Sequence, residues 1–319
     1  MTDPSQTIRA AAVEGAFGLD NVNIVQRPMP APGPGQALVR MKASSLNFRD
    51  LLVATGRYNP KMPLPRVLLS DGAGEVEAVG EGVTRVKPGD RVAGIFMQTW
   101  LDGGYIEAYG KSALGGAIEG VLADAVVFDE DGLVHLPVHL SFAEGATLPC
   151  AAVTAWNALV AQGNLKAGDT VLVQGTGGVS LFALQFARMH GARVIATSSS
   201  AGKLKRALEL GASDGIDYRA TPDWDKRARQ LTGGAGVTHV VEVGGVATLG
   251  RSLNAVAGGG YIAVIGVLSG IAGELNIAAI LHKHLRVQGI YVGSRAMFEA
   301  MNRAIELNRI HPVVDRVFP

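Results

Sequence analysis

A glycine-rich turn follows an apolar run at residues 171–180, which read VLVQGTGGVS. The apolar run is typical of a buried strand, and a helical pattern begins near Gly178. Glycine lets the backbone turn tightly and approach a pyrophosphate, and the first N–H groups of a helix favour phosphate oxygens. The pattern predicts a dinucleotide site, with a purely structural turn as the alternative. Its residues are Gly175, Thr176, Gly177, Gly178 and Val179, and Ser180 replaces the third glycine of the fingerprint.

The end of the next predicted strand indicates which dinucleotide is bound. NAD sites usually place Asp or Glu there to bind the ribose hydroxyls. Residues 197–203 read TSSSAGK and contain no carboxylate. Hydroxyl groups and a lysine suit a 2′-phosphate. We therefore expect NADP(H), held by Ser198, Ser199, Ser200 and Lys203, although an ordinary polar loop in which Ser200 caps the following helix is the alternative.

Metal chemistry has little support in the sequence. The single cysteine, Cys150, excludes an intramolecular disulfide and a multi-cysteine zinc site. We expect Cys150 to pack in the core, because no base lies near it in the sequence. Among seven histidines, His282 and His284 form an H-x-H pair without a nearby carboxylate group, and packed or surface histidines are the preferred interpretation. We expect no metal.

Two kinds of pattern must position these residues. Up to about residue 135, short alternating runs such as 37–43 are separated by Gly/Pro turns, which is typical of a β-rich domain. After Leu140, buried strands alternate with helices, which predicts a parallel, doubly wound sheet. A length of 319 residues favours two domains. The predicted fold class is therefore α/β with a second, β-rich domain.

The composition is that of a globular enzyme, with 48% hydrophobic and 18% charged residues. A net charge of +1 gives no reason to expect nucleic acid or an anionic membrane as a partner. Two long uncharged stretches, 170–187 and 252–273, are broken by glycines and polar residues, so strand–turn–helix units explain them better than membrane spans. Residues 1–10 lack the apolar core of a signal peptide, and we expect a cytoplasmic protein.

Further segments carry a family resemblance along nearly the whole chain. They are SLNFRD (45–50), SDGAGEVEAVGEGV (70–83), KPGDRV (87–92), LPCAAVTAW (148–156), VIGV (264–267) and GIYVGSR (289–295). With the glycine loop and the serine run, they resemble the medium-chain dehydrogenase/reductase superfamily, on its zinc-free quinone oxidoreductase-like branch. The resemblance implies a GroES-like substrate domain over residues 1–135, a Rossmann domain over 136–290 and an active-site cleft between them. It also implies a return segment over 291–319, which is shorter than relatives typically have.

The same resemblance implies roles for individual residues. Thr154 is expected near the nicotinamide, and Tyr218 near the adenosine phosphate. The other implied cofactor contacts are Gly266 and Val267, from the opposite strand, and Ser294 and Arg295, from the return segment. Zinc-bearing relatives use a cysteine where this chain has Leu46–Asn47 and Gly-His-Glu where it has Leu69–Ser70–Asp71. A zinc-independent protein is therefore implied.

Without a Lewis acid, conjugate reduction of a quinone, enone or enal is easier than oxidation of an alcohol, because hydrogen bonds suffice to hold the developing enolate. Asn47 and Tyr58 resemble the polar active-site positions of the family. We expect Asn47 to donate to the carbonyl oxygen and Tyr58 to shape the pocket or relay a proton. For Asp50 and Asp71, hydrogen bonding to backbone N–H groups is preferred to a catalytic role.

Two other functions stay open. One is zinc-free oxidation or reduction of simple alcohols or aldehydes on the same fold, and the other is non-catalytic NADPH binding, as in the crystallins that resemble this branch. The expected substrate is a small molecule in a site lined by Trp100 and Tyr105. Pairing of the apolar edge strand near residues 285–292 across a two-fold axis predicts a homodimer.

Overall fold

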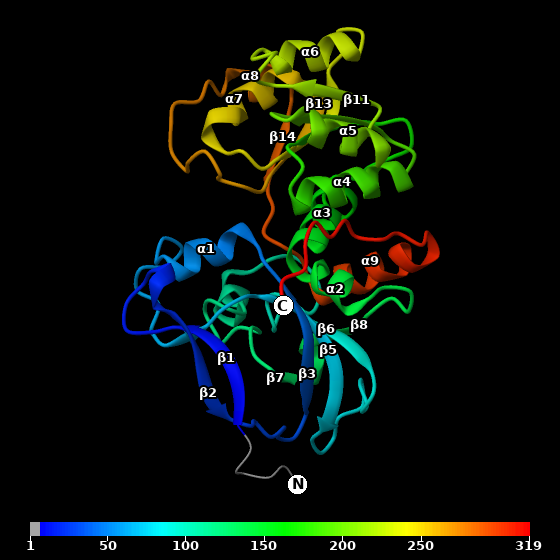
Figure 1. Cartoon of the computed structure of the whole chain (residues 1–319). Coiled ribbons are helices and arrows are strands. Elements are labelled where there is room, and N and C mark those ends of the chain that lie inside the picture. Colours follow the sequence, from blue (N-terminus) through cyan, green and yellow to red (C-terminus); the bar gives the residue numbers. More distant parts are fainter. Residues whose placement is uncertain (1–6) are drawn as a thin grey trace. The chain divides into compact units, whose positions relative to one another are not determined.

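The computed structural model describes residues 7–319, which form two compact units. Among the described residues, the first unit comprises residues 7–153 and Gly293–Pro319, and the second comprises Thr154–Val292. Figure 1 shows a β-rich body and a body in which helices flank a sheet. Residues 136–153 cluster with the first unit, so this division falls later in the chain than the expected domain limit at residue 135. The domain limits themselves remain a prediction.

The second unit is built on a six-stranded sheet in the order β11-β10-β9-β12-β13-β14. All its strand pairs are parallel. Its strands are β9 (Thr170–Gln174), β10 (Arg193–Ser198), β11 (Asp214–Asp217), β12 (Val237–Glu242), β13 (Val256–Val264) and β14 (Arg286–Gly289). The first strand of the unit lies at the centre and the order reverses across it, which is the doubly wound arrangement. The predicted α/β class is thus confirmed.

Helices connect these strands and cover the sheet. They are α3 (Val153–Trp156), a π-helical turn at Asn157–Ala161, α4 (Gly178–Met189), α5 (Ala201–Glu209), α6 (Trp224–Leu231), α7 (Val246–Ala255) and α8 (Ala278–His282). The sheet core contains Leu172, Ile195, Val240 and Ile262, all fully buried. Because the strands are parallel, the loops after β9, β10, β12 and β13 emerge at one edge, where such folds bind their ligands.

The first unit contains two antiparallel sheets, in the orders β2-β1-β4 and β7-β3-β5-β6-β8. Its strands are β1 (Thr7–Val13), β2 (Val22–Pro28), β3 (Gln36–Ser45), β4 (Arg66–Val67), β5 (Asp71–Val79), β6 (Arg91–Gly94), β7 (Ala125–Asp129) and β8 (Leu133–His135). Strand β5 buries its first four residues and then alternates between buried and exposed. Its beginning is therefore enclosed, and the chemistry-bearing residues of this unit gather there.

Helices and turns complete the first unit. They are α1 (Phe48–Ala54), α2 (Phe142–Ala146), a π-helical turn at Leu148–Ala152 and α9 (Arg295–Leu307), with 3-10 turns at Leu19–Asn21, Glu107–Ser112 and Glu130–Gly132. Helix α9 belongs to the return segment and contacts β8. Asn302 of α9 donates to the carbonyl oxygen of His135 over 2.9 Å.

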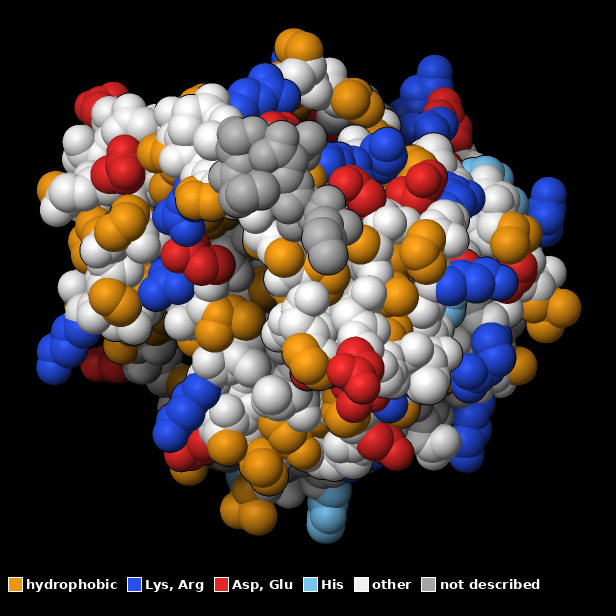
Figure 2. Space-filling view, turned by 90° about the horizontal axis from the view of Figure 1, so that it is seen from below, with side chains coloured by type: hydrophobic (Ala, Val, Ile, Leu, Met, Phe, Trp, Pro, Cys, Tyr) orange, Lys and Arg blue, Asp and Glu red, His pale blue; other side chains and the backbone are white. Residues whose placement is uncertain are grey.

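The surface carries charges of both signs. Figure 2 shows basic and acidic side chains interspersed on the face seen from below. Within residues 7–319, no helix has the length and apolarity needed to cross a membrane. The expectation that residues 1–10 are no signal peptide falls largely on residues 1–6, which lie outside the described residues.

Candidate active site

The glycine loop joins β9 to α4 at the ligand-binding edge of the parallel sheet. Gly175 has a φ of 70°, a conformation that favours glycine. Gly177 is the N-cap residue of α4 and has no side chain with which to cap the helix. A Cβ atom at Gly175 or Gly177 would meet no atom of the described residues within 4 Å. The first N–H groups of α4 are therefore open to a phosphate, as a dinucleotide requires.

Ser180 explains how the loop dispenses with a third glycine. Its side chain is buried in the first turn of α4, and its hydroxyl donates to the carbonyl oxygen of Gln174 over 2.6 Å. A hydrogen bond from the side chain at this position thus ties the helix to the end of β9. Thr176 lies in the loop before the N-cap, and Gly178 and Val179 begin α4.

The serine run lies at the end of β10. Ser200 is the N-cap of α5, and its hydroxyl accepts from the Lys203 N–H over 3.4 Å, so the capping role considered above is present. Ser198 is buried, and its hydroxyl accepts from the Ser200 N–H over 3.4 Å. Its carbonyl oxygen accepts from the Tyr218 N–H over 3.1 Å, which brings Tyr218 to this strand end. Ser199 is half-buried and Lys203 is exposed on the first turn of α5.

A buried carboxylate that sequence reasoning missed orders the next loop along the same edge. Glu242 is the last residue of β12 and is fully buried. Its donors are Gln174 Nε2 (2.7 Å), Gly244 N (2.8 Å), Gly245 N (3.0 Å), Thr248 Oγ1 (2.6 Å) and Ser252 Oγ. A charged residue inside the apolar run HVVEV was the available signal. This carboxylate links β9, β12 and α7.

The loop that Glu242 orders packs against a second loop, after β13, which contains Gly266 and Val267. A Cβ atom at Gly266 would lie 2.2 Å from the carbonyl oxygen of Val243, so only glycine allows this approach. Gly245 has a φ of 95°, and a Cβ atom there would lie 2.9 Å from Cα of Val267. The two loops after β12 and β13 are therefore packed backbone against backbone. Gly266 and Val267 lie at the predicted edge of the sheet.

The first unit holds a second group of polar residues, where α1 meets the start of β5. Asn47 is the N-cap of α1, and its N–H donates to Oδ2 of Asp50 over 2.7 Å. Asp50 is buried, and burial raises its pKa to about 6. Asp50 is thus the acidic partner in a capping box, which is the structural role that the sequence favoured.

Asp71 is the fully buried first residue of β5. Its Oδ1 accepts from the Ser70 hydroxyl over 2.6 Å, and its Oδ2 accepts from the Cys150 N–H over 2.9 Å. Burial, assisted by repulsion from Asp50, raises the pKa of Asp71 to about 7. Burial also raises the pKa of the Cys150 thiol well above its ordinary value, which opposes a nucleophilic role.

Tyr58 joins this group through Arg49. The Arg49 guanidinium lies 4.9 Å from the ring centroid of Tyr58 and 4.7 Å from that of Phe96. Its Nη1 donates to the carbonyl oxygen of Leu114 over 2.8 Å. The Tyr58 ring therefore packs against the Arg49 cation. Tyr58 is also 40% exposed, so part of its ring faces solvent. Arg49 was not singled out from the sequence, because its aromatic partners are distant along the chain.

Buried polar atoms without a hydrogen bond are concentrated here, although Asp50 Oδ1 lies 3.8 Å from Arg49 Nη1 in an ion pair. Within the described part of the chain, four such atoms belong to three neighbouring residues: Asn47 Nδ2, Arg49 Nε, Arg49 Nη2 and Asp50 Oδ1. A buried polar group without a hydrogen bond costs about 1–3 kcal/mol. A place where several such groups meet is therefore a candidate ligand or water site. Asn47 Nδ2 in particular is a donor without a well-formed hydrogen bond, and its side chain interacts with the Asp71 carboxylate.

The remaining residues expected at the cofactor are buried or have structural partners. Thr154 is buried in α3. Ser294 is buried and caps α9 by accepting from the Met297 N–H over 3.2 Å. Arg295 Nη1 donates to Oδ1 of Asp131 over 2.7 Å, within the first unit. The cofactor roles of Thr154, Ser294 and Arg295 remain predictions, and the latter two side chains already support the return segment.

The aromatic residues expected to line a pocket form a cluster. The Trp100 ring lies 5.5 Å from Tyr105 and stacks on Tyr109 at 5.8 Å, measured between centroids. Trp100 is buried, whereas Tyr105 is about half exposed. Tyr105 is thus the better candidate for a pocket wall.

No three His, Cys, Asp or Glu side chains among the described residues are grouped to hold a metal ion. His282 ends α8 and His284 follows in a turn, so the pair does not lie on a strand.

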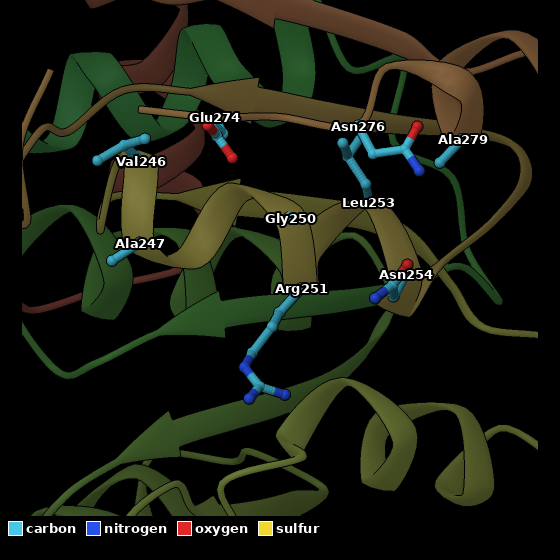
Figure 3. A pocket seen from close by; sticks show the side chains of 9 residues that line it. All are labelled: Val246, Ala247, Gly250, Arg251, Leu253, Asn254, Glu274, Asn276 and Ala279. Atoms are coloured by element: carbon cyan, nitrogen blue, oxygen red, sulfur yellow. The ribbon is translucent and has the colours of Figure 1, made fainter. Parts of the chain in front are cut away.

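The second unit also contains a cavity of about 470 Å³ against α7. Figure 3 shows Arg251 and Asn254 of α7 at this cavity, with Glu274 and Asn276 opposite them. Arg251 is engaged by Asp223 and Asp225, at 3.1 and 2.9 Å. The cavity lining includes no residue of the glycine loop or the serine run, so we assign it no part in cofactor binding.

Comparisons with known proteins cover both units. Residues 33–138 match the family model described as "Alcohol dehydrogenase GroES-like domain", and residues 178–307 match "Zinc-binding dehydrogenase". The chain is 45% identical over 309 residues to a zinc-type alcohol dehydrogenase-like protein of Schizosaccharomyces pombe, covering 95% of this chain and 89% of that protein. It is 36% identical over 270 residues to a quinone oxidoreductase of Pseudomonas aeruginosa, covering 84% and 76%.

A solved structure shows the same fold. It is an NAD-dependent alcohol dehydrogenase with a TM-score of 0.86 and 38% identity, covering 96% of this chain and 91% of the other. The β-rich first unit corresponds to the GroES-like domain, and the parallel sheet of the second is the Rossmann fold. The likeness extends along nearly the whole chain and includes proteins with oxidoreductase names. The chain therefore belongs to the medium-chain dehydrogenase/reductase superfamily, whose members are oxidoreductases that bind nicotinamide cofactors.

Proposed function

We propose that this protein is a zinc-independent, NADPH-dependent oxidoreductase that reduces a quinone or the activated C=C bond of an enone or enal. One observation carries the proposal: the Asn47 side chain presents a buried amide nitrogen that makes no hydrogen bond of normal geometry among the described residues, while the same side chain interacts with the Asp71 carboxylate and opposes the rise in its pKa. By the family resemblance, zinc-bearing relatives have a cysteine at this place. A neutral donor there suits an oxygen that gains negative charge during reduction.

The residues of the first unit supply two further properties. Asp50 accepts from the backbone N–H of Asn47, which fixes the position of the N-cap residue without using its side-chain nitrogen Nδ2. The Arg49 guanidinium holds the ring of Tyr58, so this partly exposed phenol has a defined place beside the buried group. NADPH, when bound, supplies the hydride. Asn47 then stabilises the enolate oxygen, and Tyr58 shapes the pocket or relays the proton.

The second unit supports the cofactor part of the proposal. The open amino terminus of α4, Gly175 and Gly177 suit the pyrophosphate. No carboxylate follows β10, while Ser198–Ser200 and Lys203 offer donors for a 2′-phosphate. The Ser200 hydroxyl accepts from the Lys203 N–H, and its own hydrogen can still be donated to a phosphate oxygen. Since an NAD-dependent enzyme is among the structural neighbours, both cofactors must be compared directly.

A second candidate function is oxidation of a simple alcohol. The name of the Schizosaccharomyces pombe relative, at 45% identity, is the observation in its favour. Non-catalytic binding of NADPH is the third. Turnover of an enone would exclude non-catalytic binding. The ratio of enone turnover to alcohol turnover separates the two catalytic functions.

The test compares 2-cyclohexenone and 1,4-benzoquinone with NADPH against cyclohexanol with NADP⁺, each with and without a chelator. We expect the enone or quinone to have the higher kcat/KM and the chelator to have no effect. Asn47→Ala should lower kcat/KM for the enone by roughly 100- to 1,000-fold. This corresponds to a loss of roughly 2.7–4 kcal/mol of transition-state stabilisation, the size of an oxyanion-hole deletion. Asn23→Ala, the same substitution at an exposed position of β2, is the matched control. Preferential alcohol oxidation, or full enone activity of Asn47→Ala, would contradict the mechanism.

We also propose a homodimer. Strand β14 is the last strand of the parallel sheet, and all four of its residues are exposed. An exposed edge strand offers unpaired backbone groups to a second copy across a two-fold axis. Light scattering should give twice the chain mass, and Val287→Asp, which places like charges at this edge in both copies, should favour the monomer. A wild-type monomer at all concentrations would refute this assembly.

A further inference from the structure

A buried side chain of the first unit anchors the helical segment that leads to Thr154. Asp71 accepts from the backbone N–H of Cys150, which lies in the π-helical turn Leu148–Ala152. The segment continues without interruption into α3, and Thr154 is four residues beyond Cys150. The early N–H groups of a helix have no partner within the helix. Asp71 therefore caps this segment from a strand that is distant in the sequence.

The anchor is itself held rigidly. Asp71 is fully buried, and Ser70 donates to its other oxygen over 2.6 Å. The charged or ionisable groups around it are Asp50 and Arg49 from α1 and the Cys150 thiol from the π-helical turn. Both carboxylate oxygens are thus engaged, and the Asn47 side chain also interacts with this carboxylate. The partial positive charge at the beginning of the helical segment also stabilises a negatively charged carboxylate at this place.

We propose that Asp71 is a positioning residue for hydride transfer, because it fixes where the helical segment 148–156 begins and with it the position of Thr154. The inference rests on the proposed function, in which Thr154 lies near the nicotinamide. In this scheme Asp71 touches neither the substrate nor the cofactor, but it also interacts with the Asn47 side chain, so the Cys150 variants test the anchor separately from that contact. Its contribution is geometric: misplacement of a reacting group by about 1 Å can cost about a hundredfold in rate.

Substitutions on both sides of the bond test the proposal. Asp71→Leu removes the acceptor, whereas Asp71→Asn keeps an oxygen for the Cys150 N–H, and the Ser70 hydroxyl can rotate to accept from the new amide. Cys150→Pro removes the donor at a helix position where its N–H makes no helical bond, and Cys150→Ala retains it and is its reference. Asn302→Ala, which removes a different buried side-chain bond of the first unit, is the control for general loosening.

The measurements are kcat and KM for the enone, NADPH affinity, and the primary isotope effect with NADPH deuterated at the transferred position. We expect Asp71→Leu and Cys150→Pro to lower kcat by about tenfold or more and to raise the isotope effect, while NADPH affinity changes by less than about threefold. Asp71→Asn should recover most of kcat, and Asn302→Ala should leave the isotope effect unchanged. Folded Asp71→Leu with normal kcat and isotope effect, or no advantage of Asn over Leu, would overturn the proposal.

Hydrogen exchange supplies a readout that does not require activity. The amides of residues 148–156 should exchange faster in Asp71→Leu and Cys150→Pro than in Asp71→Asn and Cys150→Ala. If exchange is unchanged, the anchoring is wrong whatever the enzyme reduces. If exchange changes as expected but the wild type reduces no quinone or enone, the proposed function is wrong and the anchor has no role in that reaction. If Asp71→Leu does not fold, Cys150→Pro against Cys150→Ala decides the question.

Discussion

The carboxylate of Asp71 accepts a hydrogen bond from the backbone N–H of Cys150 over 2.9 Å, across 79 residues of sequence. The same carboxylate is fully buried and lies beside a second buried acid, Asp50. Two acids that repel each other in a core hold protons more tightly than they would in water. This pair therefore affects the stability of the protein as well as its geometry.

Stability should fall as the pH rises through the titration of this pair. Burial raises the pKa of Asp71 to about 7 and that of Asp50 to about 6, above their ordinary value of about 4. Between about pH 4 and about pH 7, the folded protein therefore binds more protons than the unfolded chain. The stabilisation is fully present below about pH 4 and is lost by about pH 7. Asp71→Asn, which is neutral throughout, should show a smaller decline than the wild type.

Urea unfolding at intervals from pH 5 to pH 8 measures this decline. Asp102→Asn, at an exposed loop position, is the control and should follow the wild type. Comparing differences between variants removes the contribution of other titrating groups. A decline of the same size in Asp71→Asn would show that Asp71 is ionised throughout this range.

Lys203→Ala should weaken NADPH binding by about 1–3 kcal/mol and leave NADH binding nearly unchanged, because only NADPH carries the 2′-phosphate. Lys203 lies on the first exposed turn of α5, next to the Ser200 cap. Lys205→Ala, two residues further along the same helix and also exposed, is the matched control. Calorimetric titration of both cofactors into the apoprotein decides the matter. Equal losses for NADPH and NADH would exclude a 2′-phosphate contact.

Gly177→Ala should separate cofactor binding from folding. The φ of Gly177 is −77°, which alanine adopts freely, and its Cβ atom would meet no atom of the described residues within 4 Å. Unfolding of the apoprotein should therefore change by no more than about 0.5 kcal/mol. Dinucleotide affinity should fall by about tenfold or more, since the methyl group occupies the approach to the pyrophosphate.

Gly250→Ala, within α7 and equally unobstructed, is the control for Gly177→Ala. It should stabilise the helix by about 0.5–1 kcal/mol without changing dinucleotide affinity. Normal cofactor binding by Gly177→Ala would place the pyrophosphate elsewhere.

Glu242→Gln should destabilise the second unit by about 1–3 kcal/mol. Gly244, Gly245 and Thr248 all donate to the same oxygen of Glu242, and an amide nitrogen at either position would face a donor. Glu242→Ala should cost more, since it leaves every donor unpaired. Denaturant unfolding gives both values, with Glu209→Gln on exposed α5 as the control. A neutral Glu242→Gln would show that these donors are satisfied by water.

The parts of the fold that follow from local patterns were predictable. Alternating buried strands and helices predicted the parallel sheet, and the loop around Gly175 and Gly177 was found because glycine and helix starts leave signals within ten residues of sequence. The place of Ser180 was recognised as a departure from the fingerprint, but its bond to the carbonyl oxygen of Gln174 was not. A serine side chain can cap a helix, pack in the core or donate a hydrogen bond. Which of these Ser180 does depends on the backbone atoms that the fold brings near it.

The polar group of the first unit was predictable only in part. Asn47 and Tyr58 entered through the family resemblance, whereas Arg49 and the anchoring role of Asp71 depend on partners distant in the sequence, such as Phe96 and Cys150. Likewise, Glu242 was visible as a charge in an apolar strand, but its donors come from separate elements. Side-chain partnerships between distant elements leave no periodic signal along the chain.

The two parts of the first unit are separated by the whole of the second, Thr154–Val292. Bonds such as Asn302 to His135 and Arg295 to Asp131 join residues more than 160 positions apart. During synthesis on the ribosome, the second unit is available as one uninterrupted stretch before α9 has been made. The first unit must wait for that helix, and until then β8 exposes the surface that α9 will cover. The chain therefore begins its synthesis with the unit that is the last to be completed, and this interval is when it most needs protection from aggregation.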